Sequence, residues 1–61
     1  MKTGQDVMVK PDAQLPDRIK HYAGHIGTVI QADGHHDSIN TVRFADNSHV
    51  MLCDSDLIKL S

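Results

Sequence analysis

Residues 22–30, YAGHIGTVI, join two glycines that lie three residues apart to a run of β-branched side chains. A phosphate-binding loop needs backbone N–H groups that converge at the start of a helix, usually with a lysine or hydroxyl on the phosphate. Here the glycines run into residues 28–30, which disfavour a helix, and the stretch has no lysine. We therefore interpret both glycines as backbone devices. Gly24 turns the chain, and Gly27 lets a strand bend or bulge.

Short stretches of alternating apolar and polar residues surround this segment and predict strands. We expect five of them, over residues 5–10, 25–33, 39–46, 49–53 and 57–61. Residues 34–38, GHHDS, are expected to form a polar turn, and residues 46–48, DNS, a tight turn, because Asp and Asn tolerate left-handed geometry. Residues 54–56, DSD, are expected to start one helical or 3₁₀ turn with an Asp or Ser cap.

Residues 11–24 show no hydrophobic period and contain both prolines of the chain. We interpret them as a long loop between the first and second strands, with one helical turn after Pro16. Leu15, Ile19 and Tyr22 are expected to cover the core from this loop.

Alternation along the strands assigns ten residues to the core: Val7, Val9, Ile26, Val29, Val42, Phe44, Val50, Leu52, Leu57 and Leu60. Five short strands with one long early loop predict an all-β fold, a small antiparallel barrel that closes its edges. Such a core is small for the conformational entropy of the whole chain. We therefore expect a marginal monomer, for which self-association would be a supplement.

The chain has 61 residues, which predicts a single domain over residues 1–61. Its one cysteine, Cys53, cannot form an internal disulfide, and a lone thiol suits a reducing compartment. No apolar run approaches the roughly 20 residues that span a bilayer. The first ten residues do not show the pattern of a secretory signal. We expect a cytoplasmic protein.

The formal net charge is −2, and the six Lys and Arg residues are scattered among acids. Binding to duplex nucleic acid usually requires a basic face that neutralises several phosphates. The one small cluster is Arg18 and Lys20 with His21 beside them. This pattern favours an ordinary solvated surface over a nucleic-acid interface.

Five histidines raise the question of a metal site, which for zinc normally takes three or four ligands from two defined pairs. His35 and His36 are adjacent, so extended backbone would point them apart. Gly24 separates His21 from His25 and disfavours a shared helix. We therefore expect surface histidines, no metal and no cofactor. Histidines that met across an oligomer interface would make association depend on pH between about 5 and 7.

Cys53 is a candidate nucleophile. It shares a strand face with His49, but four residues of strand separate the two by ~13 Å, too far for a nucleophile and its base. We expect an ordinary buried or half-buried thiol and no catalytic residue.

The motifs GQDVMV (4–9), GHIGTV (24–29), TVRF (41–44) and DSDLIKL (54–60) cover most of the chain. In this order they resemble the SH3-like barrels, above all the electron-transport-accessory-like group. That group includes the photosystem I accessory subunit, the variable chain of ferredoxin-thioredoxin reductase and the barrel of the nitrile hydratase β subunit. KOW-type barrels share the G-x-x-G-x-V turn.

The resemblance implies a five-stranded SH3-like antiparallel barrel that docks on a larger partner and holds no catalytic residues of its own. Two alternatives stay open. The first is a KOW-like nucleic-acid-binding module that would use Arg18, Lys20, His21 and Arg43. The second is an oligomeric pore-type enzyme resembling type II dihydrofolate reductase. Its V-Q-I-Y strand corresponds here to VMLC, residues 50–53, in which methionine and cysteine replace the glutamine and tyrosine.

Two surfaces are predicted to contact a protein partner or a second copy of the chain. The first is the long loop, which mixes apolar anchors with an arginine and a tyrosine, types that interface centres favour. The second is the outer face of the fourth strand, where Met51 and Cys53 suggest a covered surface. The predicted contact residues are Leu15, Arg18, Ile19, Lys20, His21, Tyr22, Arg43, His49 and Met51. We expect a small non-catalytic interaction or accessory module.

Overall fold

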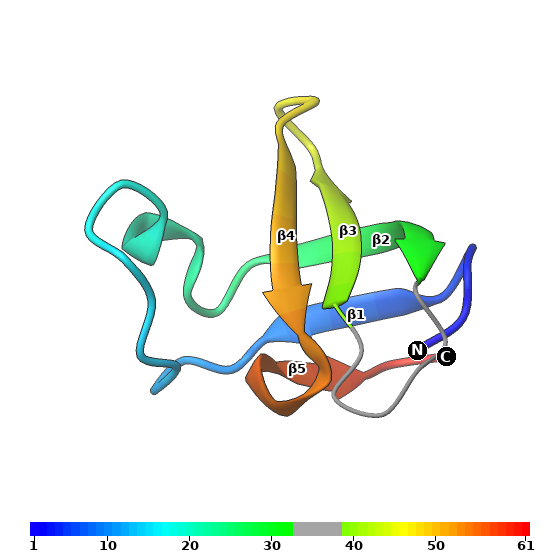
Figure 1. The fold of residues 1–61 in the computed structure, drawn as a ribbon, viewed down its shortest axis with the longest axis horizontal. Helices are drawn as coiled ribbons and strands as arrows, with labels where there is room; N and C mark the ends of the chain where they lie inside the picture. Colours follow the sequence, from blue (N-terminus) through cyan, green and yellow to red (C-terminus); the bar gives the residue numbers. More distant parts are fainter. Residues whose placement is uncertain (33–38) are drawn as a thin grey trace.

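The computed structural model describes residues 1–32 and 39–61, which form one five-stranded antiparallel sheet (Figure 1). The strands are β1 (Asp6–Val9), β2 (Ile26–Ala32), β3 (Ile39–Phe44), β4 (His49–Cys53) and β5 (Leu57–Lys59). Two 3₁₀ turns accompany them, η1 (Lys20–Tyr22) and η2 (Asp54–Asp56), and no α-helix occurs in the described ranges. The predicted turn over residues 34–38, with His35 and His36, lies outside the described residues.

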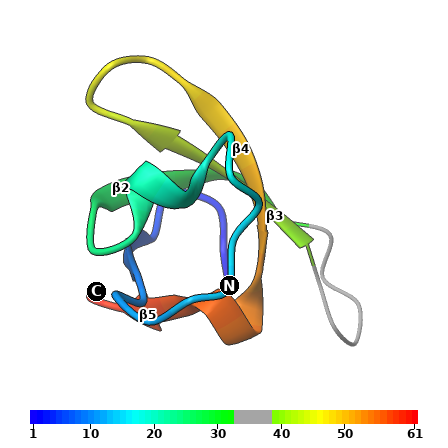
Figure 2. The same cartoon turned by 90° about the vertical axis from the view of Figure 1, so that its left-hand side faces the viewer.

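Each predicted strand is present, and the all-β prediction is confirmed. The strands follow the order β4-β3-β2-β1-β5, so β4 and β5 are the two edges of the sheet. Figure 2 shows the sheet curling around a common interior. No hydrogen bonds join β4 to β5. The sheet therefore stays open, whereas the sequence predicted a barrel with closed edges.

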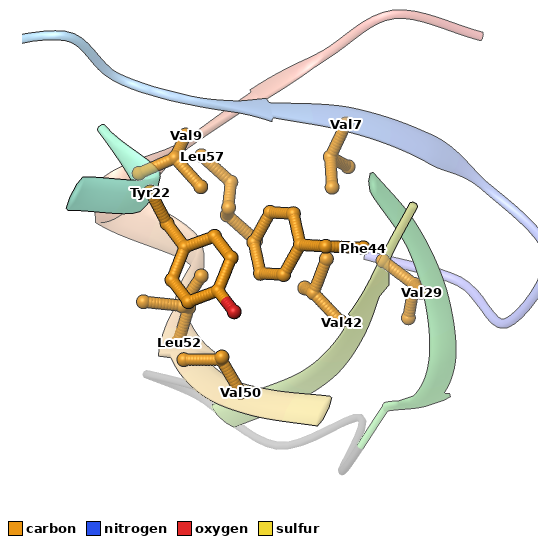
Figure 3. Close-up of a cluster of buried hydrophobic side chains, with 9 residues drawn as sticks. All are labelled: Val7, Val9, Tyr22, Val29, Val42, Phe44, Val50, Leu52 and Leu57. Carbon is orange, nitrogen blue, oxygen red and sulfur yellow. The ribbon is translucent and has the colours of Figure 1, made fainter. Parts of the chain in front are cut away.

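In the described ranges, nine hydrophobic side chains form the interior. Figure 3 shows them pointing toward one another from all five strands and from η1: Val7, Val9, Tyr22, Val29, Val42, Phe44, Val50, Leu52 and Leu57. Eight of them were predicted as core residues, and Tyr22 was expected to cover the core from the loop. Two predictions were wrong, because Ile26 is 55% exposed and Leu60 is 48% exposed.

The errors at Ile26 and Leu60 have one physical cause, the period of two along a strand. Ile26 and Val29 are three residues apart and can share a face only if a bulge lies between them. The register of β2 against β3 shifts instead between Val29 and Gln31, beyond both positions. Ile26 therefore faces outward. Leu60 likewise lies three residues after the buried Leu57 and is exposed.

The sequence predicted a bend or a bulge at Gly27. This residue stands in regular register with Val7 on β1 and Phe44 on β3, so there is no bulge at this position. Its role is close packing. A Cβ atom at Gly27 would lie 2.8 Å from the Arg43 carbonyl oxygen and 2.6 Å from Cγ1 of Val42. Gly24 does turn the chain, as predicted: its φ is +82°, and its backbone N–H donates to the Val9 carbonyl at 2.8 Å.

The connection between β3 and β4 is the predicted tight turn. Asn47 adopts a φ of 67°, and the Ser48 backbone N–H donates to Oδ1 of Asp46 at 2.9 Å. The Phe44 backbone N–H donates to the Ser48 carbonyl at 3.0 Å and closes the turn. The prediction for residues 54–56 was correct about the 3₁₀ turn and wrong about its cap. The N-cap residue is Cys53, and its side chain makes no capping hydrogen bond.

Among the residues that the structure describes, Asn40 on β3 is the one polar side chain that is fully buried beside the core. Its Nδ2 donates to Oδ1 of Asp54 at 2.6 Å and to the Leu52 carbonyl at 3.3 Å. Because buried amides need such partners, this pair of bonds ties β3 to the end of β4 and the start of η2.

We predict that Gly27→Ala lowers the free energy of unfolding by about 1–3 kcal/mol, because the added methyl overpacks backbone and core atoms that cannot move freely. Thr28→Ser, on the outer face of the same strand, is the matched control, because it keeps the hydroxyl that donates to Oδ1 of Asp6 at 3.2 Å, with an expected loss within about 0.5 kcal/mol. Urea denaturation measures both. Equal losses for the two variants would contradict the close approach at Gly27.

Candidate functional site

Tyr22, at the end of η1, attaches the β1–β2 connection to the sheet. Its ring is stacked on Phe44 with centroids 4.3 Å apart and an interplanar angle of 16° (Figure 3). Its hydroxyl donates to Oδ2 of Asp46 at 2.9 Å. With only 6% of its surface exposed, Tyr22 is a core residue and offers little to a partner. Of the predicted contact residues, it is the one that the structure places inside.

A chain of short-range backbone bonds shapes the segment before Tyr22. The Ile19 N–H donates to the Pro16 carbonyl, and the Tyr22 N–H donates to the Ile19 carbonyl, both at 3.0 Å. This compact turn follows from Pro16, which presets the backbone for helical geometry. Because Tyr22 is held by the core, the turn places Arg18 and Ile19 next to β4.

A groove of about 340 Å³ lies between this turn and β4, lined by Arg18, Ile19, His49, Val50 and Met51. Val50 belongs to the core, and Ile19 is half-buried and packs against the core. Arg18, His49 and Met51 are exposed. Apolar atoms thus form the interior side of the groove, while charged and polar groups stand at its rim.

Met51 also borders a second hollow of about 340 Å³ on the outer face of the sheet, with Gln31, Ile39 and Thr41. Thr41 stands directly opposite Met51 in the β3–β4 register. Met51 is 67% exposed and Ile39 is 43% exposed. The Met51 side chain therefore separates the groove from this second hollow, and it is exposed to solvent on both sides.

The cationic side chains near the groove are mostly free of carboxylate partners. Within the described ranges, neither Arg18 nor Arg43 forms an ion pair. Arg43 stands opposite His49 in the β3–β4 register, on the exposed face. Lys20 pairs with Asp17 at 3.7 Å, but both side chains are largely exposed, so this bond contributes little.

The structure thus brings together four residues that the sequence assigned to two separate surfaces, Arg18 and Ile19 from the loop and His49 and Met51 from the strand. The remaining predicted contact residues lie around them. Lys20 and His21 are exposed on η1, Arg43 is exposed on β3, and Leu15 is half-buried against the core. Sequence reasoning did not connect the loop to the strand, because nothing in either stretch specifies their contact.

Cys53 is exposed on β4, so the prediction of a buried or half-buried thiol was wrong. Alternation already places it on the outer face with Met51, and the strand keeps that alternation to its end. Among the residues that the structure describes, no three His, Cys or Asp side chains are grouped to hold a metal ion.

Comparisons of this chain with models of protein families, with curated proteins and with solved structures find no match. In the described part of the chain, no helix has the length and apolar character needed to cross a membrane.

The carboxyl group of Asp46, in the turn between β3 and β4, titrates with a pKa that depends on the Tyr22 contact. The Ser48 backbone N–H, and after it the Tyr22 hydroxyl, hold the pKa of Asp46 below its ordinary value of 3.8. Both bonds favour the charged carboxylate. A lowered folded-state pKa stabilises the fold at pH values above 3.8, and this stabilisation is lost as the pH falls through the folded-state pKa.

We predict that Tyr22→Phe, which keeps the stacked ring, raises the pKa of Asp46 but leaves it below 3.8, because the Ser48 N–H bond remains. An NMR titration of the carboxyl carbon measures both values. Lys59→Ala, on the opposite edge strand, is the control and leaves the pKa of Asp46 unchanged. A Tyr22→Phe variant with the wild-type pKa would show that the hydroxyl does not bond to Asp46 in solution.

Proposed function

We propose that this protein is a small protein-interaction module that docks on a protein partner, or on a second copy of itself, through the groove between residues 18–19 and β4. The observation that carries the proposal is the convergence of Arg18, Ile19, His49 and Met51 on one groove. The chemistry of docking is non-covalent, and no bond is made or broken.

The composition of the groove is that of a binding surface. Methionine and arginine are enriched in protein interfaces, and a methionine side chain adapts to irregular partners. Met51 is mostly exposed, so the isolated chain gains little of the hydrophobic free energy that burial of this side chain would supply. Covering it, together with the half-buried Ile19, would recover part of that free energy. The exposed Arg18 and His49 would then supply polar contacts at the rim.

We further propose that the curled sheet is a small SH3-like barrel. Support comes from the order of its glycine and valine motifs and from the five antiparallel strands with a 3₁₀ turn before the last one. Barrels of this kind often act by docking, which agrees with the proposed function. Fold alone does not establish function, so the groove remains the main argument.

A second candidate function is nucleic-acid binding. One observation favours it, the position of His49 between Arg18 in the groove and Arg43 on the neighbouring strand. Phosphate contacts would make the affinity for single- or double-stranded nucleic acid fall steeply as the salt concentration rises. The affinity of a protein partner for an apolar groove would depend only weakly on salt. Binding to oligonucleotides measured from low to physiological salt separates the two functions.

The docking proposal predicts that a photoreactive benzoylphenylalanine at position 51 forms adducts with protein in the native cell. Benzoylphenylalanine at position 59, on the opposite edge strand, is the control and should form few adducts. Arg18→Glu should lower the yield of adducts from position 51, because it reverses a charge on the exposed rim of the groove and leaves the core unchanged.

Two results would contradict the docking proposal. One is the absence of any adduct from position 51. The other is an identical set of adducts from positions 51 and 59, which would indicate random encounters rather than a binding surface.

A further inference from the structure

The outer edge of β4 carries backbone groups that have no strand partner. β4 pairs with β3 on one side, and no described residue pairs with its other side. The Phe44–Ser48 bond starts the β3–β4 ladder, and groups in an antiparallel ladder alternate in direction. The N–H and C=O groups of His49, Met51 and Cys53 therefore point to the open edge.

The bonds of β2 support this assignment from the other side of β3. The Val29 N–H donates to the Gln5 carbonyl at 2.9 Å, so the backbone of Val29 bonds away from β3. Its neighbour Val42 must then bond toward β4, where it stands opposite Val50. The backbone N–H and C=O groups of Met51, one residue after Val50, therefore point away from β3, toward the open edge of β4.

The two edges of the sheet differ in how they are protected. β5 has three residues and ends on Lys59, and short strands with a lysine are common protection against edge pairing. β4 has five residues, HVMLC, with no lysine, proline or bulge. An unprotected edge of this kind is a template for another strand.

We propose that this edge pairs with β4 of a second copy of the chain, in antiparallel register about a two-fold axis at Met51. The inference rests on the proposed function and names its partner. Met51 would face Met51 of the second copy, and His49 would face its Cys53. All three residues would then occupy hydrogen-bonded positions, each pair exchanging two backbone bonds.

The distribution of charge selects a second copy as the occupant. The start of β4 carries a net positive charge, with Arg18 in the groove beside His49 and Arg43 opposite His49, against one carboxylate, Asp46, in the preceding turn. The turn after β4 carries a net negative charge, because Asp56 lies three residues after Cys53, while Asp54 beside it pairs with the Met1 ammonium at 3.3 Å. Antiparallel self-pairing brings the basic start of each copy to the acidic end of the other. The surface is therefore complementary to itself, as a two-fold interface requires.

The side chains on the shared face also fit this register. The central pair would be two methionines, and the flanking pairs would be histidine with cysteine, so no like charges oppose one another at neutral pH. Two exposed Met51 side chains, each 67% exposed, would cover one another. A parallel arrangement would instead place the basic starts together and the acidic ends together.

The test combines sedimentation with two variants in the full chain. Wild type should sediment as a concentration-dependent dimer. Met51→Lys should raise the dimer dissociation constant at least about tenfold, because it sets two like charges opposite each other at the axis. Since Met51 is exposed, this variant should keep the far-UV circular dichroism of the wild type.

Register is tested by disulfide formation. Met51→Cys in a Cys53→Ser background should cross-link two copies on mild oxidation, because hydrogen-bonded antiparallel pairs have Cα atoms about 5.5 Å apart, within disulfide range. Lys59→Cys in the same background is the control and should stay largely uncross-linked.

A wild-type monomer at millimolar concentration, or a dimer unaffected by Met51→Lys, would overturn the proposal of self-pairing. Equal cross-linking from positions 51 and 59 would overturn the register. The test distinguishes a failure of self-pairing from a failure of the proposed docking function. A monomer whose position 51 still forms adducts with another protein would refute self-pairing and support docking on a larger partner.

Discussion

The ring of Tyr22 lies against Phe44 while its hydroxyl bonds to Asp46 at 2.9 Å, so one side chain contacts both the last residue of β3 and the turn that follows it. Stacked aromatic pairs and a satisfied hydroxyl are worth more than burial alone. The loop half of the binding surface depends on this contact. Leu15 and Ile19 also pack against the core and Gly24 bonds to Val9, but the Tyr22 side chain joins the η1 turn to the end of β3 and to the β3–β4 turn.

The sheet and the connection contribute different halves of the proposed surface. β4 supplies Met51 and an open hydrogen-bonding edge, since it pairs only with β3 among the described strands. The connection supplies Arg18 and the half-buried Ile19, which give the groove its charged rim and apolar wall. A second strand laid along β4 would meet both halves at once. Docking on a partner and self-pairing would therefore use the same residues.

The strands and the tight turns could be predicted from the sequence because they depend on neighbours along the chain, on alternation and on Asn47 or Gly24 at a left-handed position. Three features could not. The bulge between Val29 and Gln31 depends on pairing with β3. The burial of Asn40 depends on Asp54 and Leu52. The meeting of Ile19 with β4 depends on Tyr22 reaching Phe44, a contact between distant residues that no local pattern encodes.

If the Tyr22 contact positions the η1 turn against β4, the methyl groups of Ile19 and Val50 should give NMR cross-relaxation signals that depend on Tyr22. These signals are to be compared in the wild type and in Tyr22→Leu, which keeps an apolar side chain but loses the ring and the hydroxyl. Clear signals are expected in the wild type. In the variant they should be lost while the cross-strand signals between β3 and β4 persist. Ile19–Val50 signals of equal intensity in both proteins would show that Tyr22 does not position the turn.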